Sequence, residues 1–220
     1  MPQFAVILPA AGLSTRFGGA RSKLAEPLGG QTVLERSILA FTQREDIETV
    51  LVATRDVSVS LSKVICCGGG TSRAQSVRNA LRIVPSHIEW LAVHDAARPL
   101  VSQELIARTF TAALQHGAAV PALPVALTIK QARGPLPAKV QRTVPRDQLW
   151  AMQTPQVMRR AALLDAFDRC PIPLDQVTDD MQLLELAGHD VWLVPGDERN
   201  LKITTPMDIK LAELWLGLQG

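Results

Sequence analysis

The sequence predicts a three-layer α/β/α domain with a mostly parallel, Rossmann-like sheet and one protruding β-hairpin arm. Short apolar segments typical of buried strands alternate with longer segments that repeat apolar residues at helical spacing. Such alternation favours a parallel sheet with helices on both faces. The length of 220 residues suits one such domain, and no internal repeat, low-complexity segment or linker divides the chain. We therefore expect residues 1–220 to form a single domain.

The first half of the chain contains the clearest element signals. Residues 4–9 form an apolar run that ends at a proline and are expected to be the first buried strand. Thr32 has capping-box spacing to Glu35 and should open a helix. Ser102 and Gly117 should likewise begin and end a long helix. The other elements expected here are strands at 49–54, 64–67, 90–94 and 119–125 and a helix at 72–84.

The second half contains the arm and the remaining elements. Residues 126–146 hold two short extended runs around a Gly/Pro turn, which is typical of a hairpin. They bring little apolar surface of their own, so the arm should need another surface, which could be a second subunit. A final helix should follow Thr205, with Pro206 at its first position. The other elements expected here are helices at 159–170 and 178–187 and strands at 191–195 and 201–204.

Charge and cysteine content argue against several classes of protein. The net charge of +2 gives no strong field toward nucleic acid or a membrane. No apolar run approaches the length of a membrane span, and the N-terminal run lacks the features of a signal peptide. Cys66, Cys67 and Cys170 form neither a disulfide framework nor a zinc-binding pattern. We expect buried thiols in a reducing compartment and a cytoplasmic protein.

The loop after the first strand has the composition of an anion-binding site. Small residues at Ala10, Ala11 and Gly12 allow the backbone to approach a ligand closely, and N–H groups exposed there would bind an anion. The same loop continues with three cations: Arg16, Arg21 and Lys23. The patterns G-x-x-x-x-G-K-[ST] and G-x-G-x-x-G are both absent. A solvated basic loop is the competing interpretation, and the position at a strand end favours phosphate binding.

Two further segments place polar groups at strand ends. In H-D-A-A-R-P, Asp95 could hold a divalent metal or a hydroxyl group, or it could pair with Arg98 to close a turn. His94 could act as a base, although a lone histidine in a strand more often belongs to the core. The glycine-rich turn at 68–70 leads into a helix whose N–H groups could face an anion or a base. A simple loop with Ser72 as the N-cap is the alternative.

The remaining candidates are single polar residues near the ends of elements. Thr178 fits an N-cap better than a ligand, and Lys202 also fits an edge-strand lysine that opposes aggregation. The scattered histidines and the absence of a serine elbow argue against a zinc hydrolase or a triad enzyme. The full set is Thr128, Lys130, Arg142, Arg146, Thr154, Thr178, Asp179, Asp180 and Lys202.

Together these segments resemble one known family. The strand ending P-A-A-G, followed by Arg16 and Lys23, is similar to the nucleotide-diphospho-sugar transferase-like fold. The later motifs resemble those of the 2-C-methyl-D-erythritol 4-phosphate cytidylyltransferases of non-mevalonate isoprenoid biosynthesis, nearly from end to end. In chain order they are G-G-x-x-R-x-x-S-V, H-D-A-A-R-P, T-V-P-R-D-x-L-W-x-x-Q-T-P-Q, T-D-D and N-x-K-I-T-x-P-x-D.

The resemblance implies a role for individual residues. Arg16 and Lys23 would hold the triphosphate and neutralise the transition state, with Arg146 and Lys202 as the other catalytic cations. The residues implied at the nucleotide are Ala10, Ala11, Gly12, Gly69, Ser76, Asp95 and Ala96. The residues implied at the acceptor are Asp95, Arg98, Thr128, Arg146, Thr154, Thr178 and Lys202.

The resemblance also implies substrates, a metal and an assembly. CMP would pass from CTP to 2-C-methyl-D-erythritol 4-phosphate with release of pyrophosphate. Mg²⁺ would be held mainly by nucleotide phosphates, with Asp95 as a candidate ligand. The arm would reach into the active site of a second copy in a homodimer. Ribitol 5-phosphate is the alternative acceptor, and a non-catalytic nucleotide-binding regulator is a third hypothesis. The sequence departs from the family pattern at Ser22, Leu24, Asn79, Leu127 and Asp180.

Overall fold

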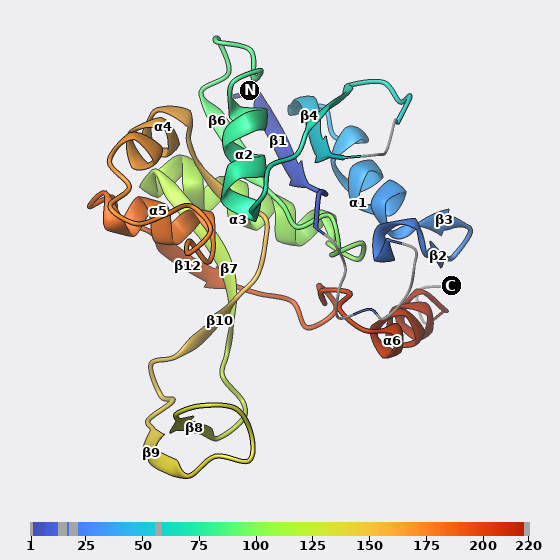
Figure 1. Ribbon diagram of the computed structural model, residues 1–220. Helices are drawn as coiled ribbons and strands as arrows, with labels where there is room; N and C mark the ends of the chain where they lie inside the picture. The colour runs from blue at the N-terminus through green and yellow to red at the C-terminus, as the bar shows by residue number, and fades with distance from the viewer. Residues whose placement is uncertain (1, 13–16, 18–21, 56–58, 218–220) are drawn as a thin grey trace.

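The chain forms a mixed sheet covered by helices on both faces (Figure 1). The computed structural model describes residues 2–12, 17, 22–55 and 59–217, so Arg16 and Arg21 lie outside it. Within these residues the main sheet has eight strands in the order β10-β7-β11-β6-β1-β4-β5, and β12 also pairs with β7. The strands are β1 (Phe4–Pro9), β4 (Ile47–Thr54), β5 (Val64–Gly68), β6 (Trp90–Val93), β7 (Ala118–Pro124), β10 (Trp150–Met152), β11 (Gln156–Arg159) and β12 (Trp192–Pro195).

Most of the sheet is parallel, which confirms the expected fold class. β1 lies parallel to both β4 and β6, β4 to β5, and β12 to β7. The exceptions are β10 and β11, which pair antiparallel with β7, while β11 also pairs antiparallel with β6. Neither of these two strands was expected from the sequence.

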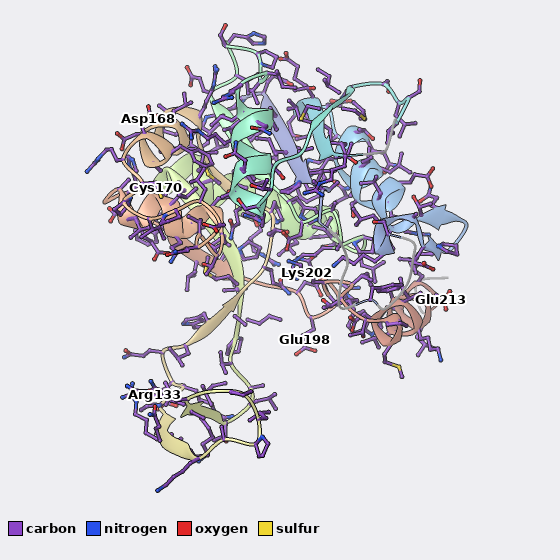
Figure 2. All side chains as sticks on the ribbon, viewed as in Figure 1. Arg133, Asp168, Cys170, Glu198, Lys202 and Glu213 are labelled. Atoms are coloured by element: carbon purple, nitrogen blue, oxygen red, sulfur yellow. The ribbon has the colours of Figure 1, made fainter. Side chains whose placement is uncertain are left out.

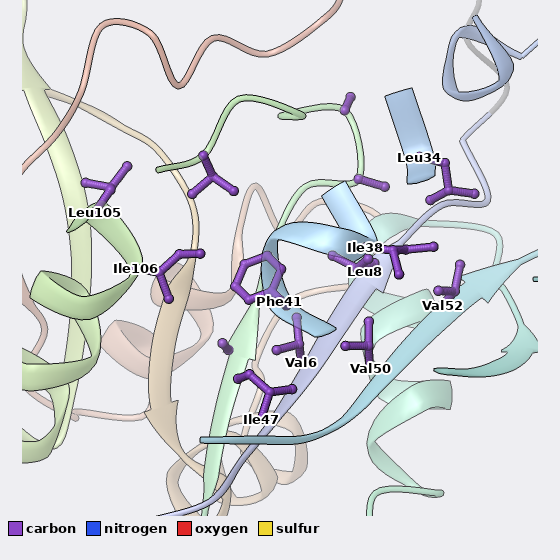
Figure 3. Close-up of a cluster of buried hydrophobic side chains, with 14 of the residues drawn as sticks. Val6, Leu8, Leu34, Ile38, Phe41, Ile47, Val50, Val52, Leu105 and Ile106 are labelled. Atoms are coloured by element: carbon purple, nitrogen blue, oxygen red, sulfur yellow. The ribbon is translucent and has the colours of Figure 1, made fainter. Parts of the chain in front are cut away.

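Side chains alternate along β1 between two separate cores. Val6 and Leu8 belong to the cluster that packs against α1 and α3, shown in Figure 3. Ala5 and Ile7 point the other way, into the cluster formed with α2, α4 and α5. Because both faces of the sheet are buried, β1 is an apolar run without polar positions. The six helices of the described chain are α1 (Val33–Thr42), α2 (Arg73–Leu81), α3 (Gln103–His116), α4 (Arg160–Asp168), α5 (Asp180–Leu186) and α6 (Pro206–Gly217).

The cap residues read from the sequence begin and end these helices as expected. Thr32 and Glu35 form a complete capping box at α1, and Ser102 and Gly117 bound α3. Ser72 caps α2, and α6 begins at the expected proline.

Within the described residues, no helix is both long and apolar enough to span a membrane. A short 3₁₀ turn η2 (Lys23–Ala25) and the small ladder of β2 (Pro27–Leu28) with β3 (Gln31–Thr32) precede α1.

Three expectations about local structure were wrong. Residues 201–204 form no strand, because Ile203 N–H donates to the Ala97 carbonyl and the rest of the segment joins no sheet ladder. Asp179, not Thr178, is the N-cap of α5, because its carboxylate accepts the hydrogen bond from Gln182 N–H. None of the three cysteines is fully buried: Cys66 is exposed because it lies on β5 at the edge of the sheet, and Cys67 and Cys170 are partly buried.

The arm forms its own two-stranded ladder away from the main sheet. It consists of β8 (Ile129–Ala132) and β9 (Val140–Val144), which pair antiparallel. This pairing confirms the predicted hairpin. Figure 1 shows it projecting from the body on the two connections to β7 and β10. Its apolar side chains Leu127 and Leu136 are 77% and 86% exposed.

Candidate active site

A cavity of about 430 Å³ opens where several parallel strands end. Its wall comes from the segments that follow β1, β4, β5 and β6, together with η2 and the irregular segment at 202–204. Ligands of open α/β sheets bind at this end of the strands, so the position agrees with a substrate site. The lining residues are Pro9, Ala10, Ala11, Gly12, Phe17, Lys23, Leu24, Arg55, Gly70, Thr71, Ser72, Arg73, Ser76, Asp95, Ala96, Ala97, Lys202 and Thr204.

Backbone contacts fix the part of the wall that the resemblance assigns to the nucleotide. Ala10 N–H donates to the Ala53 carbonyl, and Gly69 N–H donates to the Thr54 carbonyl, each over 2.8 Å. A Cβ atom added to Gly69 would stand 2.2 Å from Cβ of Ala11, so only glycine fits there. The turn after β5 therefore packs directly against the Ala11 side chain of the loop after β1.

Ser76 holds the glycine-rich turn in place. Its buried hydroxyl accepts from Gly70 N–H and donates to the Ser72 carbonyl, both over 2.9 Å. Ser72 in turn caps α2 by accepting from Gln75 N–H. Ser72 is therefore the N-cap that the simple-loop interpretation expected. Gly70, Ser72 and Ser76 also line the cavity.

Asp95 is the carboxylate at the centre of the cavity's charged cluster. Its Oδ2 atom lies 2.9 Å from Lys202 Nζ and 3.4 Å from Arg98 Nε, and its Oδ1 atom lies 3.3 Å from Arg73 Nε. Burial alone would raise the pKa of Asp95, but the charges of Arg73, Lys202 and Arg98 outweigh burial and hold the pKa well below its usual range. Asp95 is therefore ionised and can only accept hydrogen bonds.

Arg73 joins this cluster to a carboxylate beneath it. Its Nη1 atom lies 2.6 Å from Oδ2 of the fully buried Asp180. Burial alone would lower the pKa of Arg73, but Asp180 and Asp95 raise it. In the sequence, Arg73 stood out only as part of a motif and was given no role. Arg55, which lines the cavity directly after β4, was also missed, and its only sequence signal is that position.

His94 is part of the core, as the more common interpretation of a strand histidine holds. Its Nε2–H donates to the Arg98 carbonyl over 3.1 Å, so Nδ1 must accept, and Thr154 Oγ1–H donates to it over 3.0 Å. Burial lowers the pKa of His94 to about 4. The imidazole is therefore neutral, and it does not serve as a base for a substrate because it is buried outside the cavity lining with both ring nitrogens hydrogen-bonded.

Thr154 supports Asp95 from behind rather than lining the cavity. Its hydroxyl accepts from Asp95 N–H over 3.0 Å and is buried. Asn200 Nδ2 donates to the Thr154 carbonyl over 2.8 Å, which links this loop to the segment carrying Lys202. Thr154 thus contributes to the backbone position of Asp95.

The segment at 200–204 brings the expected lysines together. Arg98 Nη1 donates to the Asn200 carbonyl over 2.7 Å, and Lys23 Nζ donates to the Ile203 carbonyl over 2.7 Å. Lys202 extends from the same segment toward Asp95 and can be found between the body and α6 in Figure 2. The structure therefore places Lys23, Lys202 and Asp95 around one cavity.

Six expected site residues within the described ranges are not among those that line this cavity: Gly69, Arg98, Thr128, Arg146, Thr154 and Thr178. Thr128 and Arg146 belong to the arm, where Arg146 Nη1 donates to the Ala126 carbonyl. Thr178 is exposed, and its hydroxyl donates to Gln182 Oε1 over 3.2 Å. Arg16 lies outside the described residues. The roles of these residues stay predictions.

The described residues do not provide an all-protein magnesium site. No group of three or more His, Cys, Asp or Glu side chains in the described ranges could hold a metal ion. Both oxygens of Asp95 already face cationic side chains, so a metal at Asp95 would have to compete with them for the carboxylate. The site fits Mg²⁺ only where a bound polyphosphate supplies most of the ligands.

Comparison with known proteins identifies the family. The family model described as IspD, 2-C-methyl-D-erythritol 4-phosphate cytidylyltransferase, matches residues 4–218. The chain is 40% identical over 218 residues to the enzyme of that name from Symbiobacterium thermophilum, covering 96% of this chain and 92% of that protein. It is 38% identical over 226 residues to the bifunctional enzyme IspD/IspF of Desulfotalea psychrophila, covering 98% of this chain but only 57% of that longer protein.

Solved structures agree with the sequence comparison. The 2-C-methyl-D-erythritol 4-phosphate cytidylyltransferase from Thermus thermophilus matches with a TM-score of 0.80 at 35% identity, over 97% of this chain and 98% of that chain. The enzyme from Francisella tularensis matches with a TM-score of 0.85 at 31% identity, covering 96% of this chain and 99% of that chain. The chain therefore belongs to the 2-C-methyl-D-erythritol 4-phosphate cytidylyltransferase family.

Proposed function

We propose that this nucleotidyltransferase moves CMP from CTP to 2-C-methyl-D-erythritol 4-phosphate, releasing pyrophosphate and forming 4-diphosphocytidyl-2-C-methyl-D-erythritol. The observation that carries the proposal is the convergence of Lys23, Asp95 and Lys202, from three separate motifs, on one cavity. The family and the named relatives support the same reaction. The product would serve non-mevalonate isoprenoid biosynthesis.

The reaction needs no general base. A phosphate oxygen of the acceptor is already anionic, and it attacks the α-phosphorus of CTP in line. One P–O bond forms as the bond from the α-phosphorus to the bridging oxygen breaks, and pyrophosphate leaves with that electron pair. The neutral, fully hydrogen-bonded His94 agrees with a site that does not abstract a proton. Catalysis then depends on positioning and on charge stabilisation.

The charged side chains have separable tasks. Lys23 and Lys202 would face the charge that develops on the α-phosphate and on the leaving pyrophosphate. Asp95, being ionised, would accept hydrogen bonds from hydroxyl groups of a substrate. The small residues Ala10, Ala11 and Gly12 would let backbone N–H groups approach the nucleotide. Arg16 is proposed to join the cations on the triphosphate.

Mg²⁺, a homodimer and a cytoplasmic location complete the proposal. Magnesium would enter with CTP and neutralise phosphate charge, because the cavity's one described carboxylate is held by cations. The exposed leucines of the arm support its contact with a second copy. Arg146 and Thr128 would then serve the cavity of the partner.

Pyrophosphate release from CTP and Mg²⁺ tests the reaction and the acceptor together. 2-C-methyl-D-erythritol 4-phosphate and ribitol 5-phosphate are supplied in parallel assays, with UTP replacing CTP as a matched control. Release only with the erythritol compound supports the proposal. Release only with ribitol 5-phosphate keeps the mechanism and changes the acceptor. A folded protein that binds CTP but releases no pyrophosphate with either acceptor would support the non-catalytic hypothesis.

A further inference from the structure

We propose that Asp180 is a positioning residue for this reaction: it fixes the Arg73 guanidinium, and Arg73 fixes the Asp95 carboxylate in the cavity. The contacts run in series, from Asp180 Oδ2 to Arg73 Nη1 over 2.6 Å and from Arg73 Nε to Asp95 Oδ1 over 3.3 Å. The inference rests on the proposed function for its effect on turnover. Its structural part, the orientation of Asp95, stands apart from the reaction.

Asp180 is held firmly enough to act as an anchor. It is fully buried at the first position of α5, and its backbone N–H donates to Gln156 Oε1 over 3.0 Å. The next residues of α5, Met181, Leu183 and Leu184, are also fully buried. α5 and α2 cover the same face of the sheet (Figure 1). The series therefore connects two packed helices to the end of β6.

Stability alone does not account for this ion pair. Buried ion pairs are weak contributors to stability because desolvation offsets most of the attraction. Asp180 Oδ1 is buried and has no hydrogen-bond partner among the described residues, which adds to the cost. What the pair does provide is a fixed direction for Arg73, whose side chain reaches the cavity.

Arg73 holds the side of Asp95 that the other cations do not. Lys202 and Arg98 both contact Oδ2, whereas Arg73 contacts Oδ1. If Arg73 lost its anchor, the Asp95 carboxylate could rotate about its Cβ–Cγ bond. Lys202 would move with it, because its half-exposed side chain depends on Asp95 for its position. Asp180 thereby acts on two groups of the proposed reaction without touching the cavity.

The test is Asp180→Asn, which keeps the shape of the side chain and removes its charge. We expect kcat/KM for the acceptor to fall about tenfold or more. Asp179→Asn is the matched control, because asparagine caps a helix as well as aspartate and the ion pairs described for Arg73 are with Asp95 and Asp180. We expect this control to stay within about twofold of wild type. A wild-type kcat/KM in Asp180→Asn would overturn the inference.

A double-mutant cycle separates positioning from a general structural role. If Asp180 acts through Asp95, then Asp180→Asn should cost less than about twofold in a chain that already carries Asp95→Asn. An equal loss in both backgrounds would overturn the inference. The ¹³C resonance of the Asp95 side-chain carboxyl should shift in Asp180→Asn and not in Asp179→Asn, with or without turnover. If wild type proves inactive, the proposed function fails, and this resonance alone decides the positioning role: an unmoved resonance overturns it.

Discussion

The ammonium group of Lys202 lies 2.9 Å from Oδ2 of Asp95, although the two residues come from segments far apart in the sequence. Two hydrogen bonds hold these segments together: the Arg98 side chain donates to the Asn200 carbonyl, and Ile203 N–H donates to the Ala97 carbonyl. The irregular backbone at 200–204 therefore has a definite task. It places the Lys202 ammonium group at the cavity beside Asp95.

Lys202→Met should lower kcat by on the order of 10²-fold, by analogy with the loss of one oxyanion-hole donor. The fold should survive, because the side chain of Lys202 is 40% exposed and Asp95 keeps its contacts with Arg73 and Arg98. Pyrophosphate release and thermal unfolding measure the two effects. Lys210→Met, on the exposed side of α6, is the control and should keep normal turnover. A normal kcat in Lys202→Met would remove this lysine from the mechanism.

Lys23→Ala and Arg16→Ala should each keep the fold and lose most of kcat. Lys23 lines the cavity and donates to the Ile203 carbonyl, so its loss removes both a cation and a contact to the segment carrying Lys202. Stopped-flow pyrophosphate release, with circular dichroism as the check on folding, measures the outcome. Near-normal kcat in both variants would contradict the assignment of these two residues.

Gly69→Ala should weaken CTP binding and destabilise the protein. The added Cβ would stand 2.2 Å from Cβ of Ala11, so either the loop after β1 or the turn after β5 must move. Overpacking of this kind costs about 1–3 kcal/mol. Calorimetric titration with CTP and chemical denaturation measure the two effects. Gly68→Ala is the control, because a Cβ at Gly68 meets no atom within 4 Å. Equal behaviour of the two variants would show that close approach at Gly69 is not needed.

Local chemistry explains which elements the sequence could predict. Caps such as Thr32 and Ser102 act within one turn, so the residues that decide them are neighbours in the sequence. β10 and β11 are short strands on either side of Thr154 and Pro155, and their places depend on β7 and β6, which come earlier in the chain. The apolar pattern at 201–204 predicted a strand, but Ile203 N–H donates to the Ala97 carbonyl and the segment joins no sheet ladder.

The site was predictable where one motif supplies it and unpredictable where distant residues meet. H-D-A-A-R-P carries both Asp95 and Arg98, so their pairing could be proposed from spacing alone. The contact of Arg73 with Asp180 joins α2 to α5, and neither side chain signals the other in the sequence. For the same reason, the sequence could not decide whether His94 is a base or a core residue. The hydrogen bonds of its ring to Arg98 and Thr154 decide that it is a core residue.

Subunit mixing tests whether the arm serves a partner's cavity. Lys23→Ala damages the cavity, and Arg146→Ala damages the arm. Neither variant should be active alone, but randomly mixed dimers should recover about one quarter of wild-type activity, because about half are mixed and one site in each is intact. Co-refolding the two variants and assaying pyrophosphate release measures this. No recovery in a confirmed dimer would show that each arm serves its own subunit, and a monomer by light scattering would contradict the homodimer itself.

The buried histidine should make stability depend on pH. Burial lowers the pKa of His94 from 6.5 to about 4 in the folded chain, so between these values the unfolded chain binds a proton that the folded chain does not. The contribution of the neutral His94 to the free energy of unfolding is therefore fully present above pH 6.5 and is lost as the pH falls toward 4. At about 1.4 kcal/mol per pKa unit, the loss is about 3 kcal/mol.

The difference between wild type and His94→Gln isolates this effect from the carboxylates that titrate at lower pH. Urea unfolding measured between pH 6.5 and pH 4 gives the free energy of unfolding at each pH. This free energy should fall less with decreasing pH in His94→Gln than in wild type, whatever the absolute stability of the variant. Parallel slopes for wild type and His94→Gln would mean that His94 can be protonated without disturbing its bonds to Thr154 and Arg98. That result would reopen its assignment as a neutral core residue.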